Sequence, residues 1–170
     1  MKKGIILICV LTLVMSFAGM AGCDEKKPEV SGFNLEFKYG ITARNVLNTF
    51  EGTYTKDMVA DPPVSIDLSL SEEEKDIIYQ KMVEIDFFNY PDEFFIEVST
   101  TETITTFTPH NSYYFKVEYD SQIKELRWDD DITKPDEKAE KLRELVLFIR
   151  NIIESKEEYK ELPEPTSAYS

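Results

Sequence analysis

Two runs of alternating apolar and polar residues, separated by a short polar turn, most narrowly limit what this chain can fold into. The apolar positions are Tyr113, Phe115, Val117 and Tyr119 in the first run, and Leu126 and Trp128 in the second. Side chains of a β-strand point to its two faces in turn, so a period of two marks a strand with one buried face. Asp120-Ser121-Gln122 between the runs is a turn sequence. Together they predict an antiparallel hairpin.

Further strands are predicted from the same kind of pattern. Apolar and polar residues alternate over 33–39 and again over 64–70. Two other stretches are rich in the β-branched and aromatic residues that strands favour, namely 45–56 and 94–108. Proline or consecutive polar residues interrupt these patterns and predict turns at 61–63, 109–112 and 129–131.

Two helices are predicted by their start signals and their apolar stripes. Ser71 and Glu74 form a capping box, in which each side chain can bond the other residue's backbone N–H. The expected buried stripe of this first helix is Ile77, Ile78, Met82 and Ile85. A second helix is predicted to begin near Thr133 and Pro135. Its apolar residues recur at helical intervals, at Leu142, Leu145, Val146, Ile149, Ile152 and Ile153.

The order strands, helix, strands, helix predicts an α+β fold. Hairpins combined with two separate helices favour a two-layer sandwich, in which both helices pack on one antiparallel sheet. A chain that is 42% hydrophobic contains enough apolar surface to form such a core. We therefore expect a single domain over 33–160, followed by a polar C-terminal tail over 161–170.

The first 23 residues have the pattern of an export signal. Lys2 and Lys3 give a positive start, residues 5–15 are apolar or neutral, and small residues follow. The segment Met20-Ala21-Gly22-Cys23 resembles the lipobox of bacterial lipoproteins, with Met where Leu is usual. Taken whole, the chain resembles the small lipoproteins that are common in Gram-positive bacteria.

That resemblance implies how the N-terminus is processed. Residues 1–22 would be removed as a signal peptide, and the thiol of Cys23 would receive a diacylglycerol group. Residues 23–32 would then form a lipidated tether that holds the protein on the outer side of the cell membrane. The alternative is that residues 5–22 remain as a transmembrane anchor, since their length is near the minimum for crossing a bilayer.

Cysteine use and charge limit the partners. Cys9 would leave with the signal peptide and Cys23 would carry the lipid, so no disulfide is expected in the domain. The 19 basic residues less Lys2 and Lys3 leave 17 against 33 acidic residues, a net charge of −16. Nucleic acid is therefore not an expected partner, because its phosphates require clustered Lys and Arg. Besides the lipid bilayer, the charge favours a cationic or envelope protein partner.

Motifs for catalysis or metal binding are scarce. His110 is the single histidine, and the sequence has no GxSxG motif, no HExxH motif and no glycine-rich phosphate loop, so no cofactor is expected. Asp129, Asp130 and Asp131 are candidate ligands for a cation such as Ca²⁺, which prefers oxygen ligands. Their spacing also fits a solvated turn before a helix, where acidic residues are favourable.

Aromatic residues are the candidates for binding. Tyr and Trp combine apolar area with a polar tip, and Tyr114 and Trp128 lie on the predicted hairpin. The sequence favours a membrane-anchored, non-catalytic binding or interaction domain. One alternative is a hydrolase that uses two carboxylates on cell-envelope material. A third hypothesis is a structural module that binds a cation.

Overall fold

The structure is a computed structural model that describes residues 32–99, 101 and 105–169. The predicted signal peptide and the predicted lipidation site at Cys23 lie outside these residues. Within them, the chain forms one sheet together with helices, which confirms the α+β class of the fold prediction.

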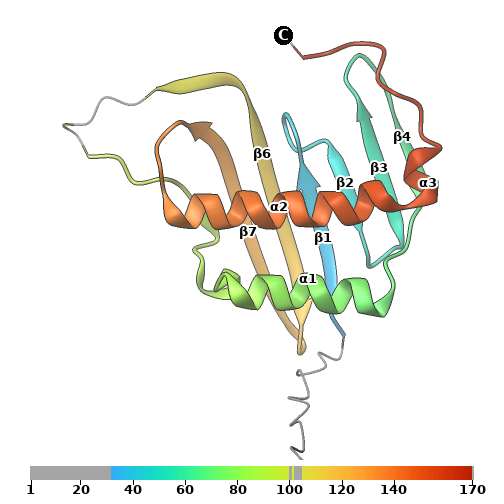
Figure 1. Ribbon diagram of the computed structural model, residues 1–170, viewed down its shortest axis with the longest axis horizontal. Helices are drawn as coiled ribbons and strands as arrows, with labels where there is room; N and C mark the ends of the chain where they lie inside the picture. The colour runs from blue at the N-terminus through green and yellow to red at the C-terminus, as the bar shows by residue number, and fades with distance from the viewer. Residues whose placement is uncertain (1–31, 100, 102–104, 170) are drawn as a thin grey trace, which may run out of the picture.

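The described residues contain one sheet of seven strands, in the spatial order β4-β3-β2-β1-β6-β7-β5 (Figure 1). The strands are β1 Asn34–Tyr39, β2 Asn45–Asn48, β3 Thr53–Met58, β4 Asp61–Asp67, β5 Glu93–Phe94, β6 Thr106–Tyr119 and β7 Gln122–Ile132. Neighbouring strands are antiparallel except β5, which pairs parallel to β7. The prediction of a wholly antiparallel sheet is therefore wrong at this edge.

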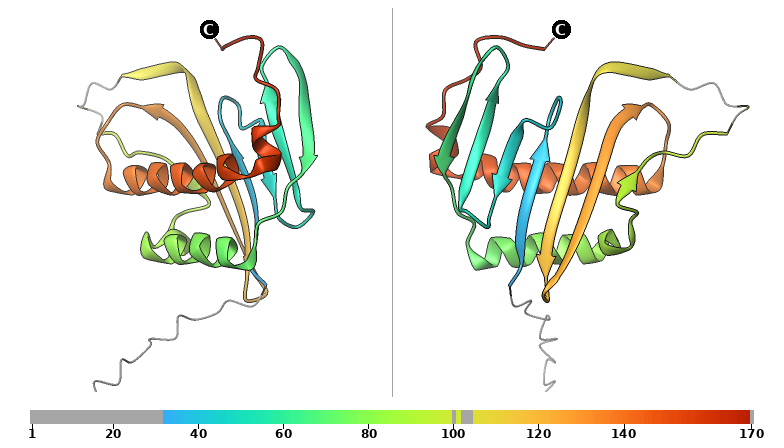
Figure 2. Two further views of the ribbon diagram at one scale, coloured as in Figure 1. Left: turned by 45° about the vertical axis from the view of Figure 1, so that its right-hand side comes forward. Right: turned by 180° about the vertical axis from the view of Figure 1, so that it is seen from behind.

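The two long helices lie on the same side of the sheet, and the opposite side is open (Figure 2). They are α1, Glu72–Glu84, and α2, Glu137–Ser155. A short 3₁₀ helix η1, Phe87–Asn89, follows α1, and one more turn of helix, α3, spans Glu157–Lys160. The open side is the first place to look for a binding surface, because none of the described helices covers it.

The predicted hairpin is confirmed, and its strands extend further than expected. Tyr119 pairs with Gln122 across a turn in which Asp120 and Ser121 both have positive φ. The predicted turns at 61–63, 109–112 and 129–131 are wrong, because these residues lie within β4, β6 and β7. Prolines are tolerated there because β4 is an edge strand and the β6–β7 register shifts around Pro109.

The capping box of α1 is confirmed in both directions. Ser71 Oγ accepts a hydrogen bond from the Glu74 backbone N–H at 3.2 Å, and Glu74 Oε2 accepts one from the Ser71 N–H at 2.8 Å. Glu74 Oε2 also pairs with Lys156 Nζ at 2.5 Å, which joins the start of α1 to the end of α2. The predicted stripe is correct except for Ile77, which is 41% exposed.

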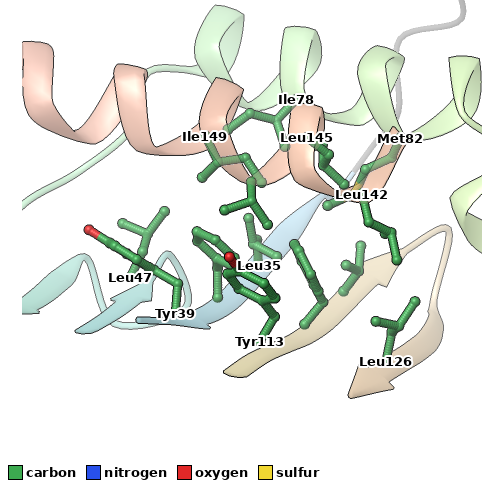
Figure 3. Packing of buried hydrophobic residues seen from close by; sticks show 14 of the residues in the cluster. Leu35, Tyr39, Leu47, Ile78, Met82, Tyr113, Leu126, Leu142, Leu145 and Ile149 are labelled. Carbon is green, nitrogen blue, oxygen red and sulfur yellow. The ribbon is translucent and has the colours of Figure 1, made fainter. Parts of the chain in front are cut away.

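The core lies between the sheet and the two helices (Figure 3). Five of the six predicted stripe residues of α2 are buried, and the sixth, Ile152, is half-buried. They meet the inward residues of the central strands, Leu35, Phe37, Leu47, Phe115 and Leu126. Burial of each such side chain stabilises the fold by roughly 1.5–3 kcal/mol, so this layer carries most of the stability.

The segment predicted as a polar tail packs against the domain. Leu162 is buried, and Lys56, which is only 5% exposed, donates to the carbonyl oxygen of Pro163 at 3.0 Å. Further along, Thr166 Oγ1 donates to Asp61 at 2.6 Å. The described part of this segment therefore covers the helix side of β3 beyond the end of α2.

Candidate functional site

The open side of the sheet presents a mixed polar surface. The strand register puts every second residue of β1, β6 and β7 on this side, in cross-strand rows. One row joins Lys38, Tyr114 and Arg127, and the next joins Glu36, Lys116 and Glu125. We call this surface the open face.

A shallow depression of about 890 Å³ lies on the open face over β1, β6, β7 and the segment that follows β5. We call it the open-face groove; its main side chains are Lys38, Glu93, Phe95, Tyr114, Arg127 and Asp131. Phe95 is 68% exposed at its margin. A large apolar ring so exposed beside a depression is a feature of interaction surfaces.

Tyr114 is held at the centre of the groove by charged neighbours. Its ring lies 5.3 Å from Lys38 Nζ and 5.0 Å from the Arg127 guanidinium carbon. These cations pair in turn with Glu36 at 2.9 Å and with Glu125 at 3.2 Å. Partial burial, followed by the nearby Glu125 and Glu36, raises the pKa of Tyr114, so its hydroxyl stays a hydrogen-bond donor at neutral pH.

Negative charge predominates in the groove. Four acids line it, Glu36, Glu93, Asp129 and Asp131, against the two bases Lys38 and Arg127. Asp129 Oδ1 accepts a hydrogen bond from Ser112 Oγ at 2.6 Å, which fixes its carboxylate on the open face. The groove therefore combines aromatic area with a surplus of carboxylates.

Trp128, the second candidate for binding, lies on the opposite side of the sheet. It is 3% exposed, and its ring packs 5.3 Å from that of Tyr113 and 5.6 Å from that of Phe94. The Arg143 guanidinium carbon lies 5.4 Å from the ring centre. Trp128 is thus part of the core, and we retain only Tyr114 as a candidate for a binding surface.

The three consecutive acids do not converge. Asp130 points toward α2, where its carboxylate takes two hydrogen bonds from Arg143, at 2.9 Å to Nε and 2.5 Å to Nη2. Asp129 lies on the open face. No group of three or more His, Cys, Asp or Glu placed to hold a metal ion is found among the described residues. The cation hypothesis therefore has no ligand set in this part of the chain.

The sequence alone did not single out Arg127 and Phe95. Arg127 could have been found, because a hairpin that turns at Asp120-Ser121 places it directly opposite Tyr114. Phe95 could not, because its position depends on β5 pairing parallel to β7. His110 lies in β6 and is half-buried.

Comparison with protein-family models, with curated proteins and with solved structures found no significant match. Among the described residues, no helix is both long enough and apolar enough to cross a bilayer.

Proposed function

We propose that this protein is a lipid-anchored binding domain on the outer side of a bacterial cell membrane, and that the open-face groove takes a cationic segment of an envelope protein. The domain belongs in our view to the two-layer α+β sandwiches, with both helices on one layer and the binding surface on the other. The observation that carries the proposal is the groove centred on Tyr114, where acids outnumber bases.

The position of the N-terminal end of β1 supports a binding surface that faces away from the membrane. Asn34, the first residue of β1, pairs with Glu118 near the β6–β7 turn, while the groove extends to Ser112, midway along β6. Six residues of strand separate Glu118 from Ser112, or about 20 Å. A lipid at Cys23 would thus hold the Asn34 end of the sheet toward the membrane and the Ser112 end of the groove away from it.

Charge complementarity supports a cationic occupant. Both bases of the groove already pair with the domain's own carboxylates, and the groove still carries two more acids than bases. Lysine or arginine of a partner would find carboxylates, and its alkyl chain or neighbouring apolar residues would pack on Phe95 and Tyr114.

The hydrolase alternative would require two convergent, desolvated carboxylates. Among the described residues, Asp130 is the one buried acid, and it pairs with Arg143. No observation therefore favours this alternative.

The anchor is tested by growing cells with an alkyne-tagged fatty acid and examining the purified protein. We expect the tag on the wild-type chain and its loss in Cys23→Ser, with a mature N-terminus at residue 23. A chain that starts at Met1 and carries no tag would show that the N-terminal segment is an uncleaved anchor.

The groove is tested by capture of partners from the cell's own detergent-solubilised membranes. The double variant Tyr114→Ala, Asp131→Lys is expected to lose a captured protein that the wild type and Ser65→Lys retain. Ser65 is a suitable control because it is exposed on β4, at the edge of the sheet away from the groove. Identical capture by all three proteins would contradict the proposed site.

A further inference from the structure

A second hollow lies on the helix side of the sheet, near the end of β1, the middle of β6 and Arg150 of α2. This cavity of about 180 Å³, which we call the Arg150 cavity, is lined by Tyr39, Gly40, Asn45, Asn111, Tyr113 and Arg150. Tyr39 and Tyr113 rise from the two neighbouring strands on the side that carries the helices (Figure 3). The volume equals that of about six water molecules, which is enough for a carboxylate with a short carbon chain.

The walls of the cavity are fixed by hydrogen bonds. The Tyr39 hydroxyl is 2.7 Å from that of Tyr54, and Asn45 Nδ2 donates to the Tyr39 carbonyl oxygen at 3.3 Å. The Ser112 N–H donates to the Gly40 carbonyl oxygen at 2.9 Å, so β1 and β6 stay in register to the rim. A site with walls held in this way is preorganised for a ligand.

Arg150 has a donor that the described part of the chain leaves unused. Its Nη2 donates to Glu154 at 3.0 Å, and its guanidinium carbon lies 5.4 Å from the centre of the Tyr39 ring. Its Nε is buried, and no hydrogen-bond partner for it is found among the described residues. A buried donor without an acceptor costs about 1–3 kcal/mol, so this N–H favours any ligand that brings an oxygen to it.

The lining of the Arg150 cavity differs in composition from the acidic chain as a whole. It contains one arginine and no acid, although the chain has 33 acidic residues against 19 basic ones. Two tyrosines and two asparagines supply the other polar groups. The guanidinium pairs with Glu154 through Nη2, and its remaining N–H groups, beside neutral hydrogen-bonding side chains, match a carboxylate in charge and shape.

We propose that the Arg150 cavity binds a carboxylate group, either of a small organic acid or of a polypeptide C-terminus. The carboxylate accepts hydrogen bonds from the Arg150 guanidinium and lies between Tyr39 and Tyr113. This site is separate from the open-face groove, because Tyr113 and Tyr114 lie on opposite sides of the sheet. The proposed carboxylate site can therefore be tested independently of the proposed cationic partner of the groove.

The test is an NMR titration of the ¹⁵N-labelled full chain in detergent micelles, which follows the Nε–Hε signal of Arg150. That signal is assigned by its loss in Arg150→Lys. The probes are acetate, its neutral analogue acetamide, and one short peptide with either a free or an amidated C-terminus. Arg127→Lys is the matched control, since it removes an arginine on the open face and leaves the cavity intact.

We expect acetate to shift the Arg150 signal saturably in the wild type and in Arg127→Lys, and acetamide to bind at least tenfold more weakly. In Arg150→Lys, the shifts of the cavity's backbone amides should disappear, while a retained melting temperature shows that the variant folds. Tighter binding of the free peptide than of acetate would identify a C-terminus as the source of the carboxylate, and equal binding would identify a small acid. No saturable shift with acetate or with the free peptide, or equal shifts in Arg150→Lys, would overturn the proposal.

Discussion

Asp129 and Asp130 are neighbours in the chain, but their carboxylates lie on opposite sides of the sheet. Asp129 bonds Ser112 on the open face, whereas Asp130 is buried against Arg143 of α2. Successive residues of a strand point in opposite directions, so the three consecutive acids of β7 cannot all converge on one ion. The run that resembled a cation site is divided between a groove and a structural ion pair.

Replacing Asp130 should therefore affect stability strongly. Asp130→Ala removes the buried partner of Arg143 and leaves it only its pair with the exposed Glu140, so we expect the free energy of unfolding to fall by about 2–3 kcal/mol. Asp129→Ala, which removes an exposed side chain, should cost about 1 kcal/mol or less. Urea denaturation measures both. Equal losses of unfolding free energy in the two variants would contradict the structural role of the Asp130–Arg143 pair. A rise in melting temperature with Ca²⁺ that Asp130→Ala abolishes would support a cation site instead.

Local patterns in the sequence predicted the elements that depend on nearby residues. The Ser71 capping box, the Tyr119–Gln122 turn and the α2 stripe all follow from spacing within one element, and the structure contains each of them. The parallel pairing of β5 could not be predicted in this way, because it brings Phe94 beside Trp128 from a distant part of the chain. The position of Phe95 at the groove depends on that pairing.

The buried tyrosines should make the fold sensitive to alkali. Burial raises the pKa of Tyr39 to about 12, although its bond to Tyr54 acts in the other direction. A raised folded pKa means that this tyrosine ionises first in the unfolded chain. Its contribution is therefore complete below about pH 10 and is lost as the pH rises toward 12, on the order of 2 kcal/mol.

Urea denaturation between pH 8 and pH 12 measures this dependence. Tyr39→Phe removes the titrating group and should show a smaller fall in stability over the same pH range. The same pH dependence in wild type and variant would show that other groups cause the alkaline loss.

Glu74 should contribute stability that disappears in acid. Burial acts to raise its pKa, but the bonds from Lys156 and Ser71 outweigh burial and lower it. A lowered folded pKa gives a contribution that is present above the unfolded pKa and lost as the pH falls through the folded value. Glu74→Gln should cost about 1–2 kcal/mol at pH 7, and less below about pH 4.

The control for this prediction is Glu72→Gln. Glu72 also pairs with a lysine, Lys75, but its side chain is almost fully exposed, so the change should cost less than about 0.5 kcal/mol. Comparable losses for the two variants at pH 7 would indicate that the link to Lys156 contributes nothing.

The C-terminal segment should stabilise the domain. Leu162 is buried in the core cluster, so Leu162→Ala should lower the free energy of unfolding by about 2–3 kcal/mol. Leu147→Ala makes the same chemical change at an exposed position of α2 and should have an effect below about 0.5 kcal/mol. Thermal melting of both variants distinguishes a packed segment from a free tail.

The central claim is that the open-face groove binds a cationic protein segment outside the membrane, and site-specific photo-crosslinking in living cells tests it most directly. A photoreactive residue is placed at Phe95, at the margin of the groove, or at Ser65 as the control on the same side of the sheet. The account predicts a crosslink from position 95 to an envelope protein at a segment that contains Lys or Arg, weakened by Asp131→Lys and not formed from position 65. No crosslink from position 95, or the same product from both positions, would contradict it.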